Sequence, residues 1–126
     1  MIDINKQITY WKNVAVEDWE VAQELVNSGR GRHGLFFAHL AIEKLIKALV
    51  CRYTQDLAPR IHNLVRLAEV AALPLNQNQI DIIAEMNAFN IEGRYPDSSI
   101  LPLSHVESQD YLSRAGKVYQ WLMNQL

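Results

Sequence analysis

Residues 35–47 read Leu-Phe-Phe-Ala-His-Leu-Ala-Ile-Glu-Lys-Leu-Ile-Lys, an apolar helical run that few polar side chains interrupt. At about 100° per residue, His39, Glu43 and Lys47 fall within an arc of about 80°, so they form one polar stripe. The stripe has two interpretations. It is either a solvent-facing edge, on which Glu43 and Lys47 form an ordinary i,i+4 pair, or the wall of a cleft. On the first interpretation, Lys44 and Lys47 are exposed.

Helical periodicity continues on both sides of this run, and strand signals are missing. The pattern predicts helices over approximately residues 8–29, 35–54, 62–74, 76–95 and 104–122. Asn76 with Gln79, and Ser104 with Glu107, have the spacing of capping boxes at the starts of the last two helices. Short connections make sequential helices pack antiparallel. The predicted fold is therefore all-α, an antiparallel four-helix up-and-down bundle with an additional short helix.

Three glycines, Gly29, Gly31 and Gly34, lie between the first helix and the central one. Such a cluster is found both in helix-ending turns and in loops that bind phosphate. No strand and no nucleotide-binding fingerprint surrounds it here. We therefore interpret the glycines as turn residues.

Composition indicates one compact domain that spans residues 1–126. The chain has 126 residues, of which 49% are hydrophobic, enough to form a core. Cys51 is the single cysteine, so no internal disulfide forms, and the N-terminal residues do not resemble a secretory signal. We expect a cytoplasmic protein without a membrane span. Neither Cys51 nor the four histidines have metal-ligand spacing, and we expect no cofactor.

The net charge of −2 and the pI near 6.0 argue against a protein that binds nucleic acid indiscriminately, and we find no DNA-binding motif. The charge is unevenly distributed. Residues 30–66 hold seven basic and two acidic residues, a balance of +5, whereas the rest holds five basic and twelve acidic residues, a balance of −7. Either residues 30–66 form one basic surface, or the folding of the helices mixes the charges.

Asp18 lies within the apolar seam of the first helix, between Val14 and Val21. An unpaired buried carboxylate is costly. Asp18 is therefore either wetted by a rotation of the helix or met by a cation from another helix. Because bundle sites form from facing side chains, we expect Asp18, Glu43 and Arg94 to meet across the core.

A second polar set lies on the fourth predicted helix. Asn87, Asn90 and Arg94 fall within about 60° of one another by helical projection, and Tyr95 follows at the helix end before Pro96. Arg94 is either a structural salt-bridge partner of an acidic residue or a functional cation.

The chain resembles HEPN domains, small helical proteins of bacteria and archaea. The resemblance rests on four segments in a shared order, namely residues 15–18, 36–49, 60–64 and 89–97, the second reading Phe-Phe-Ala-His-Leu-Ala-Ile-Glu-Lys-Leu-Ile-Lys-Ala-Leu. It implies a helical, dimerising protein with one of two activities. Some family members are metal-independent ribonucleases, whereas others bind a small nucleotidyltransferase encoded beside them and are proposed to bind nucleotides.

The sequence departs from the ribonuclease pattern, which places a His four to six residues after an Arg near the C-terminus. Arg94 is followed by no His before His105. Arg32 and His39 have a similar spacing, but they lie at the wrong end of the fold, and we treat the pair as coincidence.

The predicted function is that of a homodimeric partner of a nucleotidyltransferase in a toxin–antitoxin-like module, with nucleotide or RNA phosphate as ligand. The ligand-binding candidates are Asp18, His39, Glu43, Lys47, Asn87, Asn90 and Tyr95. One alternative is a metal-independent ribonuclease, in which Arg94 supplies charge, His62 transfers a proton, Glu43 orients His62 and Tyr95 donates a hydrogen bond. Another is a structural dimer without ligand, in which His62 only bonds backbone groups at a helix start.

Overall fold

The computed structural model describes residues 2–94 and 103–126, and only the backbone of residues 91–94. This part of the chain forms five helices, α1 (Ile4–Asn27), α2 (Gly31–Thr54), α3 (Leu64–Val70), α4 (Gln77–Arg94) and α5 (His105–Gln125). No strand occurs in either of these ranges. The predicted all-α class is therefore confirmed.

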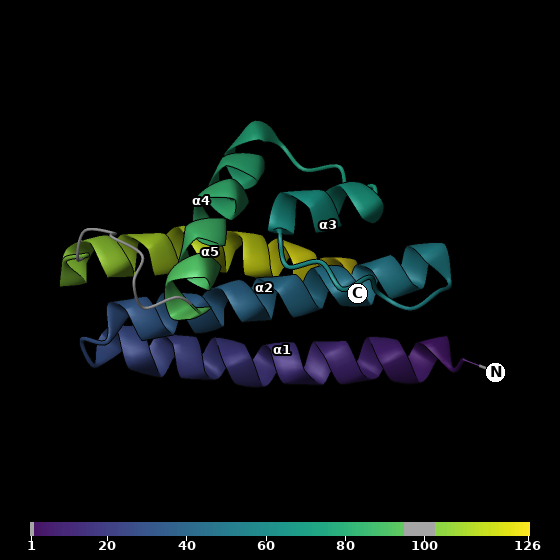
Figure 1. Ribbon diagram of the computed structural model, residues 1–126, viewed down its shortest axis with the longest axis horizontal. Coiled ribbons are helices and arrows are strands. Elements are labelled where there is room, and N and C mark those ends of the chain that lie inside the picture. The colour runs from purple at the N-terminus through teal and green to yellow at the C-terminus, as the bar shows by residue number, and fades with distance from the viewer. Residues whose placement is uncertain (1, 95–102) are drawn as a thin grey trace.

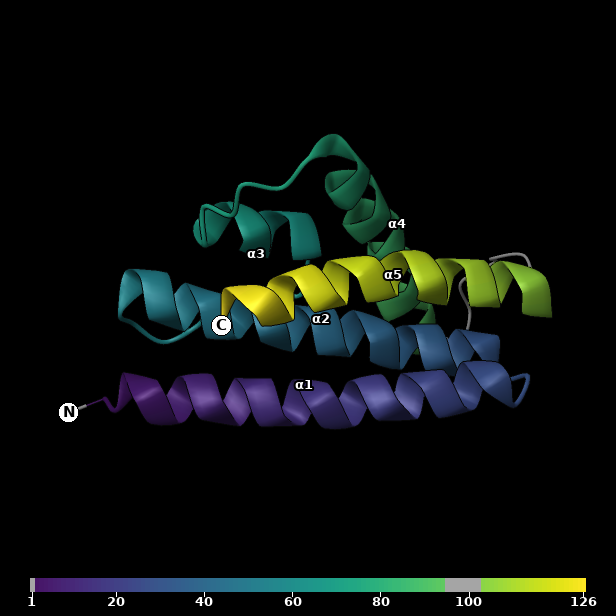
Figure 2. The same ribbon diagram turned by 180° about the vertical axis from the view of Figure 1, so that it is seen from behind.

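The long helices build a bundle around α2. Helices α1 and α2 form an antiparallel hairpin, and α5 lies along α2 in the same direction as α2 (Figure 1 and Figure 2). Helix α4 crosses α2 and α5 at a steep angle, and the short α3 lies beside it over α2. The four-helix bundle with one additional short helix is as predicted, and α4 is its most inclined member.

Helix α2 is the centre of the bundle because α1, α3, α4 and α5 all pack against it. Every residue from 38 to 51 is buried except Leu40 and Lys44, which are partly buried. A helix covered on all sides has no solvent-facing edge for a polar stripe. The polar side chains of α2 therefore lie in the interior of the protein.

The glycine cluster has two structural roles. Gly29 adopts a left-handed φ of 86° in the turn after α1, as predicted. Gly31 and Gly34 instead lie within α2. A Cβ at Gly34 would come within 2.8 Å of the Val26 nitrogen and 2.9 Å of the Ala22 oxygen, both backbone atoms of α1. Gly34 thus allows α1 and α2 to approach closely, a role that the turn interpretation missed.

Side-chain caps set several helix starts. The predicted box before α4 is reciprocal, because the Gln79 nitrogen donates to Asn76 Oδ1 and the Asn76 nitrogen donates to Gln79 Oε1, each at 2.8 Å. Ser104 and Glu107 form the predicted capping box of α5. Asn63 caps α3 by accepting from the Arg66 nitrogen, so the helix begins at Leu64, later than the predicted start at residue 62, and His62 is not its cap.

None of the helices in the ranges described is both long enough and apolar enough to span a bilayer.

Candidate functional site

The buried carboxylate of Glu43 is the centre of the polar group inside the bundle. Glu43 is 3% exposed. Lys47 Nζ lies 3.1 Å from Glu43 Oε2, and His62 Nδ1 lies 3.2 Å from Glu43 Oε1. Because a carboxylate only accepts hydrogen bonds, both nitrogens act as donors. Glu43 therefore holds one donor from its own helix and one from the loop that precedes α3.

His62 is the exposed member of this group. Its side chain is 52% exposed, whereas that of Glu43 is 5% exposed. With Nδ1 directed at the carboxylate, Nε2 is the ring nitrogen left for a ligand. The site is thus an exposed imidazole held by a buried anion.

A side chain of α4 fixes the backbone beside His62. Asn87 Oδ1 accepts a hydrogen bond of 2.9 Å from the Leu64 nitrogen, two residues after His62. This bond joins the start of α3 to α4. Asn87 therefore supports the site without being part of it. Its oxygen also accepts from one of the backbone N–H groups at the start of α3 that have no partner within the helix.

His39 is the fully buried neighbour of Glu43, at 0% exposure. Its Nδ1 lies 3.8 Å from Glu43 Oε1 and 3.4 Å from Asn90 Nδ2, which donates to it. Burial lowers the pKa of the His39 imidazole to about 4, although the charge of Glu43 raises it in part. His39 is therefore neutral at pH 7. Its Nε2 has no hydrogen-bond partner within the part of the chain described.

Lys47 corrects the expectation of an exposed side chain. It is 6% exposed and lies between Glu43 and the ring of Trp11, whose centroid is 5.2 Å from Nζ. The cation is stabilised by the carboxylate on one side and by an aromatic face on the other. The interpretation of the polar stripe as a solvent-facing edge is wrong, because His39, Glu43 and Lys47 are all buried.

Asp18 does not join Glu43, contrary to the expectation from sequence. Lys44 Nζ lies 2.5 Å from Asp18 Oδ2, and the two side chains are 19% and 13% exposed. Of the two alternatives for Asp18, the cation from another helix is correct. In the ranges described, no hydrogen bond or ion pair joins Asp18 to the Glu43 group, by which we mean His39, Glu43, Lys47 and His62. The Asp18–Lys44 pair therefore links α1 to α2 separately. Lys44 is not among the predicted site residues, because it follows Glu43 directly and so lies about 100° around α2 from the stripe.

The remaining candidates are Asn90, Arg94 and Tyr95. Asn90 is 8% exposed and contacts His39. Arg94 is the last residue of α4, and its side chain lies outside the description. Tyr95 lies outside the described residues altogether. The predicted meeting of Asp18, Glu43 and Arg94 is thus wrong for Asp18 and stays a prediction for Arg94.

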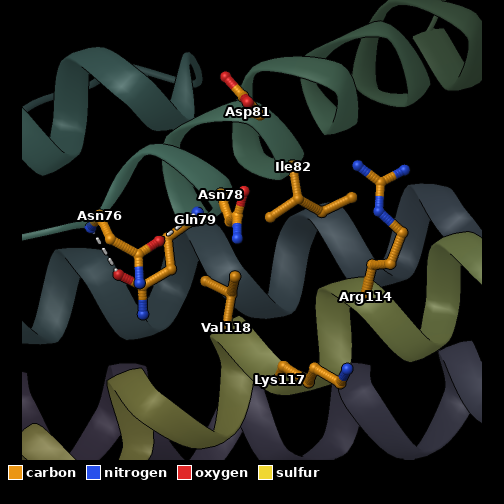
Figure 3. A pocket seen from close by; sticks show the side chains of 8 residues that line it. All are labelled: Asn76, Asn78, Gln79, Asp81, Ile82, Arg114, Lys117 and Val118. Atoms are coloured by element: carbon orange, nitrogen blue, oxygen red, sulfur yellow. Dashed lines mark hydrogen bonds between the residues drawn. The ribbon is translucent and has the colours of Figure 1, made fainter.

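A hollow of about 430 Å³ lies elsewhere, between the start of α4 and α5 (Figure 3). The amide side chains of Asn76, Asn78 and Gln79 line one side, and Arg114 and Lys117 project from α5. No candidate from the sequence analysis lines it. Arg114 Nη2 is bound to Glu85 Oε2 at 2.6 Å, and Asn76 and Gln79 are bound to each other in the cap.

The geometry around Glu43 permits two kinds of chemistry. A half-exposed imidazole that is held by a carboxylate can donate from Nε2 to an anion when it is protonated. When it is neutral, the same nitrogen can accept a proton from a bound hydroxyl group, as a general base does. Both require the ring to be held in one orientation, which the contact with Glu43 achieves.

Comparisons with known proteins are consistent in family and fold. TT1696 from Thermus thermophilus has a solved structure with a TM-score of 0.79 and 20% identity, over 95% of this chain and 98% of that one. ST0689, described as an archaeal HEPN homologue, has a TM-score of 0.70 and 17% identity, over 99% and 98%. At these identities the likeness concerns the fold alone. No curated protein matches the chain significantly. A family model described as the HEPN domain matches residues 8–126, and the chain therefore belongs to the HEPN domain family.

Proposed function

We propose that this HEPN-domain protein is a dimeric binding partner of a minimal nucleotidyltransferase, in a toxin–antitoxin-like module, and that it binds the phosphate of a nucleotide or an RNA beside His62. The observation that supports this best is the contact of 3.2 Å between His62 Nδ1 and the buried Glu43. A surface histidine without a function does not require a buried anion to hold its ring. Here the fold maintains a buried charge at a cost in desolvation, and its exposed partner is an imidazole.

Local charge supports an anionic ligand. Arg60 and Arg66 are exposed on either side of His62 in the sequence. Phosphate oxygens accept charge-assisted hydrogen bonds from guanidinium and imidazolium groups. Two other basic residues of the segment 30–66, Lys44 and Lys47, are paired with carboxylates inside the bundle. We therefore propose that Arg60 and Arg66 attract the phosphate to His62.

Titration calorimetry with ATP, GTP and AMP, each with and without Mg²⁺, tests the ligand. We expect binding heat for at least one nucleotide, and a loss of affinity of about tenfold or more in His62→Ala, because a charge-assisted hydrogen bond is removed. His33→Ala is the matched control, since His33 is another exposed histidine of the basic segment. No heat and no thermal shift at millimolar nucleotide would contradict the proposed ligand.

Sedimentation and co-expression test the partners. The chain has a mass of 14.5 kDa, so a homodimer has twice that mass. We expect a homodimer when the chain is produced by itself. We expect a larger complex when it is produced together with a nucleotidyltransferase encoded beside its gene. A species of 14.5 kDa at micromolar concentration contradicts the dimer, and separate elution of the two proteins contradicts the partnership.

A second candidate function is metal-independent cleavage of RNA. The specific observation in its favour is the same carboxylate–imidazole contact, because a general base needs a fixed ring and an exposed nitrogen. Arg94 would supply positive charge to the phosphorane. RNA is incubated with the protein in excess chelator, and then with Arg94→Ala and His62→Ala. Cleavage that both substitutions abolish supports this function, and intact RNA at stoichiometric protein excludes it.

If neither binding nor cleavage is observed, the third alternative remains, namely a structural dimer in which the Glu43 group only joins α2, α3 and α4.

A further inference from the structure

We infer that Glu43 and Lys47 are positioning residues that fix the tautomer of His62. Glu43 accepts from Nδ1 and thereby leaves Nε2 as the nitrogen that meets the ligand. Lys47 binds the other oxygen of Glu43 and so holds the carboxylate in the orientation that meets Nδ1. The inference rests on the proposed function for its ligand, but not for its geometry.

The division of the Glu43 oxygens supports these separate roles. Lys47 Nζ is 3.1 Å from Oε2, and His62 Nδ1 is 3.2 Å from Oε1 and 3.4 Å from Oε2. The carboxylate thus faces a permanent cation on one side and the imidazole on the other. Because the Lys47 side chain is only 8% exposed, solvent screens its charge little. A neutral residue at this position would leave Glu43 Oε2 without its lysine donor.

The Glu43 carboxylate is placed to select one tautomer of His62. It offers acceptors only, so Nδ1 must carry a hydrogen to make this contact. In free imidazole side chains the neutral ring prefers the hydrogen on Nε2. The geometry therefore predicts the less common tautomer for His62, with the lone pair of Nε2 directed away from Glu43.

The other described groups near His62 carry no buried charge at pH 7. From α2, His39 also approaches Glu43, but burial lowers its pKa to about 4 and it is neutral at pH 7. Helix α4 contributes the neutral amide of Asn87. The loop and α3 carry the exposed Arg60 and Arg66, which solvent screens. Among the side chains that the structure describes, Glu43 and Lys47 are thus the buried charges beside the ring.

Nuclear magnetic resonance of the imidazole in the ligand-free protein tests the inference, because nitrogen-15 shifts report the tautomer of the neutral ring. In the wild type we expect the Nδ1–H tautomer. Glu43→Met should move the ring toward the Nε2–H tautomer, because methionine offers Nδ1 no oxygen acceptor. Lys47→Met should move it in the same direction, but less, because the Glu43 carboxylate loses the donor that holds its other oxygen.

Lys44→Met is the matched control. Lys44 is also a partly buried lysine of α2 paired with a carboxylate, but its partner is Asp18. We expect Lys44→Met to keep the Nδ1–H tautomer, although the protein loses stability. A change of tautomer in Glu43→Met and Lys47→Met but not in Lys44→Met cannot result from a general loss of stability. The same tautomer in all variants overturns the inference.

If a variant fails to fold, the wild-type tautomer still tests the inference, because an Nε2–H tautomer contradicts the role of Glu43 directly. Calorimetry with ATP on the same proteins tests the proposed function separately. The expected tautomers without ATP binding would overturn the proposed function and leave the positioning roles in place. ATP binding together with an Nε2–H tautomer in the wild type would support the proposed function and overturn the positioning role of Glu43.

Discussion

At the scale of single residues, the buried histidine of the site behaves unlike the exposed one. His39 is fully enclosed, contacts Asn90 and lies near Glu43. His62 touches the same carboxylate from the surface. Burial penalises a charged imidazole and lowers the pKa of His39, so position in the fold keeps this histidine neutral at pH 7.

His39 therefore makes stability depend on pH. Its pKa is about 4 in the folded protein, below the 6.5 of an unperturbed histidine. Between these values the unfolded chain binds a proton that the folded protein excludes, so stability is present above pH 6.5 and is lost as the pH falls toward 4. We expect His39→Gln to reduce the loss between about pH 7 and about pH 4.5 by about 2 to 3 kcal/mol, measured by urea unfolding.

His33→Gln provides the comparison, because His33 is exposed. It should keep the pH dependence of the wild type. If His39→Gln has the same dependence as the wild type, the account of His39 as a buried neutral group is wrong.

At the scale of helices, the close approach of α1 and α2 depends on Gly34. Gly34→Ala would place a Cβ within 2.9 Å of two backbone atoms of α1, which cannot rotate away. We expect a loss of about 2 kcal/mol or more in the free energy of unfolding, because overpacking separates the helices. In Gly116→Ala the nearest atom is 3.2 Å away, on the Trp19 side chain, so the loss should be smaller. Equal losses in denaturant unfolding would contradict this.

The pair of Asp18 and Lys44 joins the same two helices by charge. Asp18→Ala leaves a lysine that is 19% exposed without its carboxylate. We expect a loss of about 2 kcal/mol, less than for a fully buried pair. Glu17→Ala is the control, since Glu17 is exposed on the same helix. A loss of only a few tenths of a kcal/mol in Asp18→Ala would mean that water replaces Asp18 as a partner.

The periodicity of each helix could be predicted from sequence, but not which neighbour covers each face. The capping boxes at Asn76 and Ser104 involve only residues three positions apart, so spacing alone could predict them, and both are confirmed. The burial of Lys47 depends on α1 supplying Trp11, and the partner of Asp18 depends on the rotation of α2. Such facts follow from packing between helices, which spacing within one helix does not contain.

At the scale of the whole molecule, the bundle brings parts of the chain that are far apart into one site. Glu43 comes from α2, His62 from the loop before α3, and Asn87 from α4. The central position of α2 makes this possible, because the other four helices pack against it. This chain shares its family and its fold with other HEPN domains, whereas the function that we propose for it depends on the Glu43 group.

The central claim is that Glu43 acts on the ligand through His62. The most direct test is a double-mutant cycle on the dissociation constant for ATP, with Glu43→Gln, His62→Gln and both together. We predict that each single change weakens binding by about tenfold. The combined variant should then be no weaker than His62→Gln, since Glu43 has no role without the imidazole. Losses that multiply, or affinities that neither change alters, would contradict the account.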